Sequence, residues 1–215
     1  MQQNQAADSL QTLQEIRNIM ERSARFLSLS GWSGIWAGST ALVGAYIAYR
    51  WLPYTRIISK DPEYISYGPA TSSLLFLALS VFIVALAGGF FFTWRKGRSE
   101  GANLWNSASR QFLAQLALPI LAGAIFCIGF IYYGHTMYLS PACLIFYGLA
   151  LINASKFTLS DIRYLGALEV GLGCINLFVP EWSLYLWAAG FGLLHILYGI
   201  IMWNKYDKKS GETTR

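Results

Sequence analysis

The sequence predicts an all-helical protein of six transmembrane helices, arranged as three hairpins and preceded by an amphipathic cytosolic helix. Three observations lead to this fold class. Of 215 residues, 55% are hydrophobic and only 13% are charged, whereas soluble domains have about 25% charged residues. The apolar residues form long blocks, and about 20 apolar residues of helix suffice to cross a bilayer. The basic residues gather in alternate connecting segments, as they do in proteins that cross a membrane repeatedly.

Six apolar runs are candidate spans, and the fifth is short for a span. They cover roughly Phe26–Tyr49, Pro69–Trp94, Phe112–Tyr133, Tyr138–Ser155, Tyr164–Val179 and Trp182–Trp203. The chain then divides into an N-terminal helix over residues 1–28, a membrane domain over 29–204 and a polar tail over 205–215. A chain of this size is nearly all membrane, with no room for a separate soluble catalytic domain.

The distribution of Lys and Arg predicts the orientation. If the N-terminus is cytosolic, the outward segments hold only Arg50, Arg56 and Lys60 of the sixteen basic residues. The inward segments hold all the others: Arg17, Arg22, Arg25, Arg95, Lys96, Arg98, Arg110, Lys156, Arg163, Lys205, Lys208, Lys209 and Arg215. This bias follows the positive-inside rule, so both termini are expected in the cytosol. The net charge of +5 is therefore a topology signal, and nucleic acid is not an expected partner.

An amphipathic helix is predicted before the first span. Asp8 is a suitable N-cap, and Gln11 completes a pattern like a capping box. Leu13, Ile16 and Met20 form a narrow apolar stripe beside a ladder of alternating charges. One interpretation is a helix on the cytosolic lipid surface. The other is a docking helix for a cytosolic protein or for a second copy of this chain.

The first span carries a stripe of small residues. Ser30, Gly34, Gly38, Ala41 and Ala45 recur every three or four positions, and glycines four residues apart let helix backbones approach closely in membranes. The stripe predicts a helix-packing face. The spacing alone leaves open whether it packs within the subunit or between two subunits.

The third and fourth spans are expected to form a hairpin around a tight turn at Gly134 and His135. Cys127 and Cys143 lie symmetrically about this turn and therefore share a depth in the membrane. Equal depth does not require that they face each other. With Cys174, these cysteines lie inside spans and lack the spacing of metal ligands, so we interpret them as small buried apolar residues.

The last two spans contain the most unusual residue of the chain. Glu169 is the only carboxylate in any of the long apolar runs. The short Pro180-Glu181-Trp182 connection makes these two spans antiparallel neighbours, which places Glu169 and His195 at matching depths. Both lie on helix faces rich in small residues, and small faces pack together. We therefore expect Glu169 and His195 to meet in a polar pocket that opens toward the cytosol, although Glu169 could instead reach water at the cytosolic end.

The early part of the chain also resembles a known group. The stretch LQEIRNIMERSARFLSLSGWSGIWAGSTALVGA, residues 13–45, is similar to the start of a group of uncharacterised bacterial inner-membrane proteins. In that group a cytosolic helix leads through a similar Arg-Phe-Leu-Ser-Leu-Ser-Gly run into a glycine-rich first span. The resemblance implies the bacterial inner membrane as the location. Genes of the group lie near winged-helix regulators, which implies a sensing or regulatory role.

Three classes of function follow from these observations. The sequence shows no catalytic or cofactor signature and no metal-type cluster, so no catalytic residue, cofactor or metal is expected. A regulatory, sensing or scaffolding membrane module needs only the helical bundle and the N-terminal helix. A small transporter or channel would use Glu169, His195, Asn176 and Asn153 as a polar or proton pathway. An intramembrane enzyme is the least favoured class, because one Glu and one His make a thin site.

Overall fold

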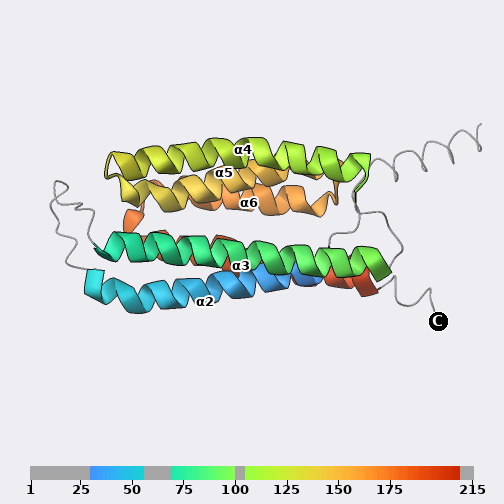
Figure 1. The fold of residues 1–215 in the computed structure, drawn as a ribbon, viewed down its shortest axis with the longest axis horizontal. Coiled ribbons are helices and arrows are strands. Elements are labelled where there is room, and N and C mark those ends of the chain that lie inside the picture. Colours follow the sequence, from blue (N-terminus) through green and yellow to red (C-terminus); the bar gives the residue numbers. More distant parts are fainter. Residues whose placement is uncertain (1–29, 56–68, 100–104, 209–215) are drawn as a thin grey trace, which may run out of the picture.

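The computed structural model describes residues 30–55, 69–99 and 105–208, and every regular element in this part of the chain is helical. The all-helical fold class is therefore confirmed. The helices lie side by side along the long axis of the molecule (Figure 1). The N-terminal helix expected over residues 1–28 and the tail beyond residue 208 lie outside the described residues, so that part of the expected domain division is not described.

The described helices form six rods. In chain order these are α2 (Gly31–Thr55), α3 (Pro69–Ser99), α4 (Ser107–Tyr132), α5 (Leu139–Ala154) with 3-10 turns at both ends (η1, Thr136–Tyr138, and η2, Ser155–Phe157), α6 (Asp161–Asn176) and a final composite rod. The final rod consists of η3 (Pro180–Trp182), α7 (Ser183–Trp187), the π-helix η4 (Ala188–Leu194), α8 (His195–Met202) and the π-helix η5 (Trp203–Asp207).

Four of the described helices are long and apolar enough to cross a membrane by length and composition. They are Ser72–Ser99, Ser107–Tyr132, Thr136–Phe157 and Pro180–Asp207, and they indicate a membrane protein. Helices α2 and α6 are not among them. Helix α6 has 16 residues, which at 1.5 Å per residue is about 24 Å and shorter than about 30 Å of hydrocarbon.

Local signals outside the apolar runs set the helix ends. Helix α4 begins five residues before the apolar run because Asn106 and Ser109 form a capping box. Its other end is the tight turn expected at Gly134, which has a φ of 76°. The amide of His135 donates to the carbonyl of Phe130, and that of Gly134 donates to Ile131. These bonds form a Schellman motif, which favours glycine at the left-handed position.

The packing of the rods only partly follows their order along the chain. Helix α2 packs on α3, and α4 packs on α5. However, α6 packs most extensively on α5, and the final rod packs chiefly on α2. Figure 1 accordingly shows α4, α5 and α6 on one side of the molecule and α2 with α3 on the other. The final rod contacts both groups, since it also packs on α5 and α6.

The small-residue stripe of α2 faces the final rod. A Cβ atom added to Gly38 would lie 2.5 Å from the carbonyl oxygen of Gly192, and one added to Gly34 would lie 3.0 Å from the Cα atom of Gly199. Ser30, Ala41 and Ala45 are buried as well. At Gly34 and Gly38 the stripe therefore brings two backbones of the same chain together.

Candidate functional site

Glu169 lies near the middle of α6 and is completely enclosed. The exposed fraction of the residue is 0%, and neither carboxylate oxygen has a hydrogen-bond partner. A buried polar group without a partner costs free energy, and buried carboxylates normally find several hydrogen bonds. Glu169 is therefore the least satisfied buried polar side chain in the described part of the protein, and it is the centre of the candidate site.

His195 is the nearest polar side chain that could pair with this carboxylate. Its Nδ1 atom lies 3.3 Å from Oε1 of Glu169. The same nitrogen lies 3.1 Å from the carbonyl oxygen of Gly190, within hydrogen-bond geometry. Its Nε2 atom lies 2.8 Å from the hydroxyl oxygen of Tyr147 on α5. Glu169 and His195 thus approach as an ion pair would, while the aligned hydrogen bonds of the imidazole go to Gly190 and Tyr147.

These contacts allow two arrangements of hydrogen atoms around a neutral imidazole. In the first, Nδ1–H donates to Gly190, and the Tyr147 hydroxyl donates to Nε2. In the second, Nε2–H donates to Tyr147, and Nδ1 accepts a proton shared with the Glu169 carboxyl group. A doubly protonated imidazole would donate from both nitrogens. The position of the protons therefore decides whether Nδ1 of the imidazole is hydrogen-bonded to Gly190 or to Glu169.

A π-helical segment positions His195. His195 comes directly after the π-helix η4. Each hydrogen-bonded turn of a π-helix contains one more residue than a turn of an α-helix, so Gly190, five positions before His195, faces the imidazole. Such segments are often found at functional sites. A Cβ atom on Gly190 would lie 2.5 Å from Oε2 of Glu169 and 2.6 Å from the Cδ2 atom of Leu144. Gly190 therefore makes the space that the carboxyl group occupies.

Aromatic rings line one side of the imidazole. The ring of Phe191 stacks on His195 with a centroid distance of 6.0 Å, and Tyr147 lies 5.4 Å from it. Trp187 packs on Phe191 at 5.1 Å. The polar atoms of the site are therefore held among apolar surfaces, where electrostatic interactions are stronger than in water.

Asn176 does not join Glu169. Its amide nitrogen donates to the hydroxyl of Ser140 at 2.7 Å, and its amide oxygen accepts from the hydroxyl of Ser183 at 2.8 Å. The Ser140 hydroxyl in turn donates to the carbonyl of Ser183. This closed set of hydrogen bonds links α5, α6 and α7. Seven residues separate Asn176 from Glu169, or about 10 Å along α6.

Asn153 also lies apart from the pair. Its amide nitrogen donates to the carbonyl oxygen of Gln115 at 3.0 Å and to the side-chain oxygen of the same residue at 2.7 Å. Asn153 therefore connects α5 to α4. The structure brings Glu169 and His195 together, whereas the side chains of Asn176 and Asn153 are hydrogen-bonded at other helix contacts.

One step of the sequence argument for the pair is wrong. The small faces of α6 and the final rod do not pack on each other: Gly166 and Gly173 pack on α5, whereas Gly192 and Gly199 pack on α2. Glu169 has no exposed surface in the structure, so its carboxyl group lies in an enclosed space. The matching depth of Glu169 and His195 in their two helices was the step that led to the observed contact.

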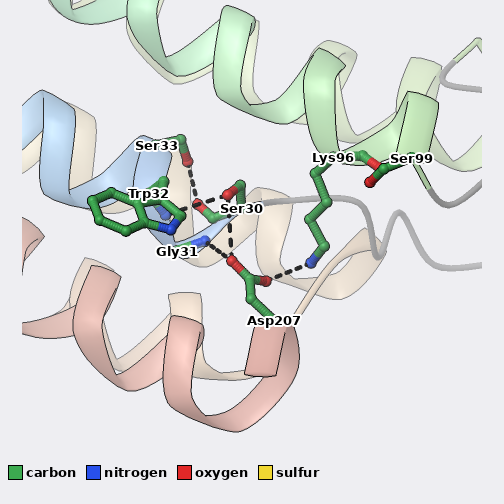
Figure 2. A network of polar contacts seen from close by, with 7 residues as sticks. All are labelled: Ser30, Gly31, Trp32, Ser33, Lys96, Ser99 and Asp207. Carbon is green, nitrogen blue, oxygen red and sulfur yellow. Dashed lines mark hydrogen bonds and ion pairs between the residues drawn. The ribbon is translucent and has the colours of Figure 1, made fainter. Parts of the chain in front are cut away.

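A second polar network ties the end of the chain to the start of α2. Figure 2 shows Asp207 between α2 and α3. Its Oδ2 atom accepts from the amide of Gly31 at 3.0 Å and from the Ser30 hydroxyl at 3.3 Å, and its Oδ1 atom accepts from Nζ of Lys96 at 2.7 Å. Asp207 thereby satisfies a free amide at the positive end of the α2 dipole.

Asp161 makes a related contact on α6. Its carboxylate accepts from Nζ of Lys205 at 2.9 Å and from the hydroxyl of Tyr206 at 2.9 Å. Asp161 precedes the apolar run of α6. Partial burial favours its neutral form, but the bonds from Lys205 and Tyr206 outweigh burial and lower the pKa of Asp161 below its ordinary value. With Asp207, this contact anchors η5 to both groups of helices.

Sequence reasoning missed two members of the buried site, Tyr147 and Gly190. A tyrosine in an apolar run is equally consistent with a position at the lipid interface, and nothing in a single sequence marks a π-helical turn. The one sequence feature that could have pointed to Gly190 is its position five residues before His195, the only histidine of the sixth apolar run.

Comparison with protein-family models, curated proteins and solved structures finds no match to this chain. The chemistry of the site is therefore argued from its geometry. Among the described residues, no three His, Cys, Asp or Glu side chains lie close enough together to hold a metal ion. What the arrangement offers is a proton-binding group that is enclosed, incompletely hydrogen-bonded and next to an imidazole.

Proposed function

We propose that the chain is a sensing or regulatory module of the bacterial inner membrane, with six spans and both termini in the cytosol. Its sensing element is the buried centre of Glu169, His195 and Tyr147. The observation that carries this proposal is the Glu169 carboxyl group, which is fully enclosed without a hydrogen bond and lies 3.3 Å from His195. The resemblance of residues 13–45 to inner-membrane proteins encoded near regulators supports the same role.

An incompletely satisfied polar centre suits a switch. A fully hydrogen-bonded network holds one structure, whereas a buried group with no partner leaves alternative proton positions close in free energy. Buried histidine is the usual device by which proteins turn a change of protonation into a change of structure. At this site the proton position decides whether the imidazole binds the backbone of η4 or the side chain of α6. A change there would alter the contact between two helices.

The change can reach the cytosolic end through α2. A Cβ atom on Gly34 would lie only 3.1 Å from the carbonyl oxygen of His195, so the backbone of the site residue rests directly on α2. Helix α2 begins immediately after the N-terminal segment. In this proposal, residues 1–28 transmit the state of the centre to a cytosolic protein or to a second copy of the chain.

The test compares the pH dependence of stability in matched variants. The purified protein in lipid nanodiscs should show a thermal midpoint that varies between about pH 4 and pH 8, the range over which Glu and His ordinarily titrate. Glu169→Gln and His195→Gln should flatten this profile. Glu181→Gln, which changes an exposed glutamate, is the control and should keep the wild-type profile. Wild-type profiles in both site variants would disprove the proposal.

The alternative function is a small transporter or channel, and the same buried carboxyl group without a hydrogen bond favours it. Ionisable groups inside membranes often mark the paths of protons and ions. The two functions differ in one measurement, the flux of protons into vesicles that contain a pH-sensitive dye. Flux that disappears in Glu169→Gln supports transport. A pH-dependent midpoint without flux supports sensing.

A further inference from the structure

Two cysteines of the α4–α5 hairpin face each other. The Sγ atoms of Cys127 on α4 and Cys143 on α5 lie 3.9 Å apart, and both residues are half-buried. Cys174 on α6 is exposed instead. The sequence indicated only that Cys127 and Cys143 share a depth, and the structure adds that their side chains meet. The pair belongs to no part of the Glu169 site.

The backbones of the two helices are close at this point. One turn below the pair, a Cβ atom on Gly123 would lie 2.5 Å from the Cβ atom of Phe146. The rings of Phe126 and Phe146 are in contact, with centroids 5.2 Å apart. The approach of the thiols therefore follows from the close crossing of α4 and α5. A disulfide needs an S–S distance of about 2 Å, so the two sulfur atoms have to move about 2 Å closer for the bond to form.

We propose that Cys127 and Cys143 form a redox-active pair, which closes into an intramolecular disulfide by exchange with a small uncharged disulfide. The thiolate of one cysteine attacks the donor disulfide, forms a mixed disulfide and releases one donor thiolate. The thiolate of the second cysteine then attacks the protein sulfur of the mixed disulfide and releases the other donor thiolate. The two protons lost by the cysteines go to the two released thiolates. The cysteines are oxidised and the donor is reduced.

The experiment uses the full chain in nanodiscs and 4,4′-dithiodipyridine as the uncharged donor. In a Cys174→Ser background, the protein should release two thiopyridone molecules and keep no adduct, and its intact mass should fall by that of two hydrogen atoms. Adding Cys127→Ser or Cys143→Ser should reduce the release to one thiopyridone molecule and leave one adduct on the protein. Two stable adducts, or no reaction, in the Cys174→Ser protein would overturn the proposal.

A positional control separates pairing from general reactivity. Cys127→Ser combined with Ile128→Cys, in the same background, moves one thiol to an exposed position about 100° around α4. This variant should keep two adducts, or one adduct if the Cys143 thiol reacts slowly. Disulfide formation in this variant as fast as in the parent would also overturn the proposal, because it would show that the crossing geometry is not what selects the pair.

Discussion

At the scale of single residues, Gly190 illustrates how one absent side chain creates a site. The Glu169 carboxyl group and the Leu144 side chain fill the space next to its Cα atom, and both residues are fully buried. The carbonyl of Gly190 meanwhile accepts a hydrogen bond from Nδ1 of His195 in one tautomer. One position therefore supplies both the space for the carboxyl group and a competing partner for the imidazole.

Gly190→Ala is expected to disturb this site. The new methyl group would lie 2.5 Å from Oε2 of Glu169 and 2.6 Å from Cδ2 of Leu144, so these two fully buried side chains would have to shift. Overpacking of this kind costs about 1–3 kcal/mol. We expect a lower thermal midpoint in nanodiscs and a loss of the pH dependence attributed to Glu169.

The matched control for that variant is Gly171→Ala on α6. A Cβ atom at Gly171 meets no other atom within 4 Å. Because alanine is a better helix former than glycine by about 1 kcal/mol, this variant should be neutral or slightly stabilised. Equal destabilisation by the two substitutions would show that Gly190 has no special role.

The unusual residue of the site was visible in the sequence, whereas its surroundings were not. A carboxylate in an apolar run is conspicuous because its burial is costly. The partner was found by counting residues on either side of a connection, which gives depth but not direction. Tyr147 comes from a helix outside the predicted hairpin, so only the packing of α5 against the final rod could reveal it.

At the scale of elements, η5 fastens the end of the final rod to the rest of the bundle. Asp207 binds the first turn of α2 and Lys96 of α3, and Lys205 binds Asp161 of α6. The Asp207–Lys96 pair is mostly buried, with exposed side-chain fractions of 13% and 12%. The Lys205 side chain is half-exposed, and exposed ion pairs contribute little. Asp207 should therefore contribute more to holding η5 in place.

Asp207→Ala is expected to loosen the start of α2. The Gly31 amide would lose its acceptor, and loss of a helix cap costs about 0.5–2 kcal/mol. Amide hydrogen exchange, followed by mass spectrometry, should become faster in a peptide that covers Gly31 and the residues after it. Lys96→Ala removes the ion pair but leaves Asp207 as the acceptor of the Gly31 amide, so it should have a smaller effect at α2.

Lys208→Ala, at the exposed neighbouring position, is the control and should leave exchange at α2 unchanged. If Asp207→Ala matches this control, the carboxylate does not cap α2 in the membrane-embedded protein.

Helix ends were less predictable than helix interiors. Hydrophobicity marks the part of a helix that avoids water, whereas capping residues decide where the helix begins. Helix α4 therefore starts at Ser107, after its Asn106 cap, and not at the first apolar residue. The π-helix η4 could not be predicted at all, because the same residues would suit an unbroken α-helix.

At the scale of the whole molecule, the packing order differs from the chain order. The final rod returns to the beginning of the described chain, and its contact with α2 is formed where glycines of both helices meet. Long-range pairings of this kind have no signal in hydrophobic periodicity, because every face of these helices is apolar. The small-residue stripe of α2 showed which face packs closely, but it did not show which helix covers that face.

The contact between the final rod and α2 also leads to a prediction about the membrane topology of the chain. Ser30 and Asp207 are hydrogen-bonded to each other, so the chain enters and leaves the described bundle at the same end. Helix α3 returns to this end, where Lys96 binds Asp207. The end of α2 and the start of α3 therefore lie at the opposite end of the bundle (Figure 1). The excess of basic residues in the segments at the first end predicts that this end is cytosolic.

Single cysteines at Ser210 and Ser59 test this topology in intact cells. The host protein carries Ser in place of Cys127, Cys143 and Cys174, so that only the introduced thiol reacts with a membrane-impermeant maleimide. We expect Ser59→Cys to be labelled from outside the cell. Ser210→Cys should be labelled only after the membrane is opened. The contact between Asp207 and Ser30 places the start of α2 and the end of the final rod at one end of the bundle, and the basic residues predict that this end is cytosolic. Labelling of both cysteines from the same side would contradict the arrangement of six spans. In that arrangement the chain crosses the membrane once before residue 59 and six times before residue 210, so the two residues must lie on opposite faces of the membrane.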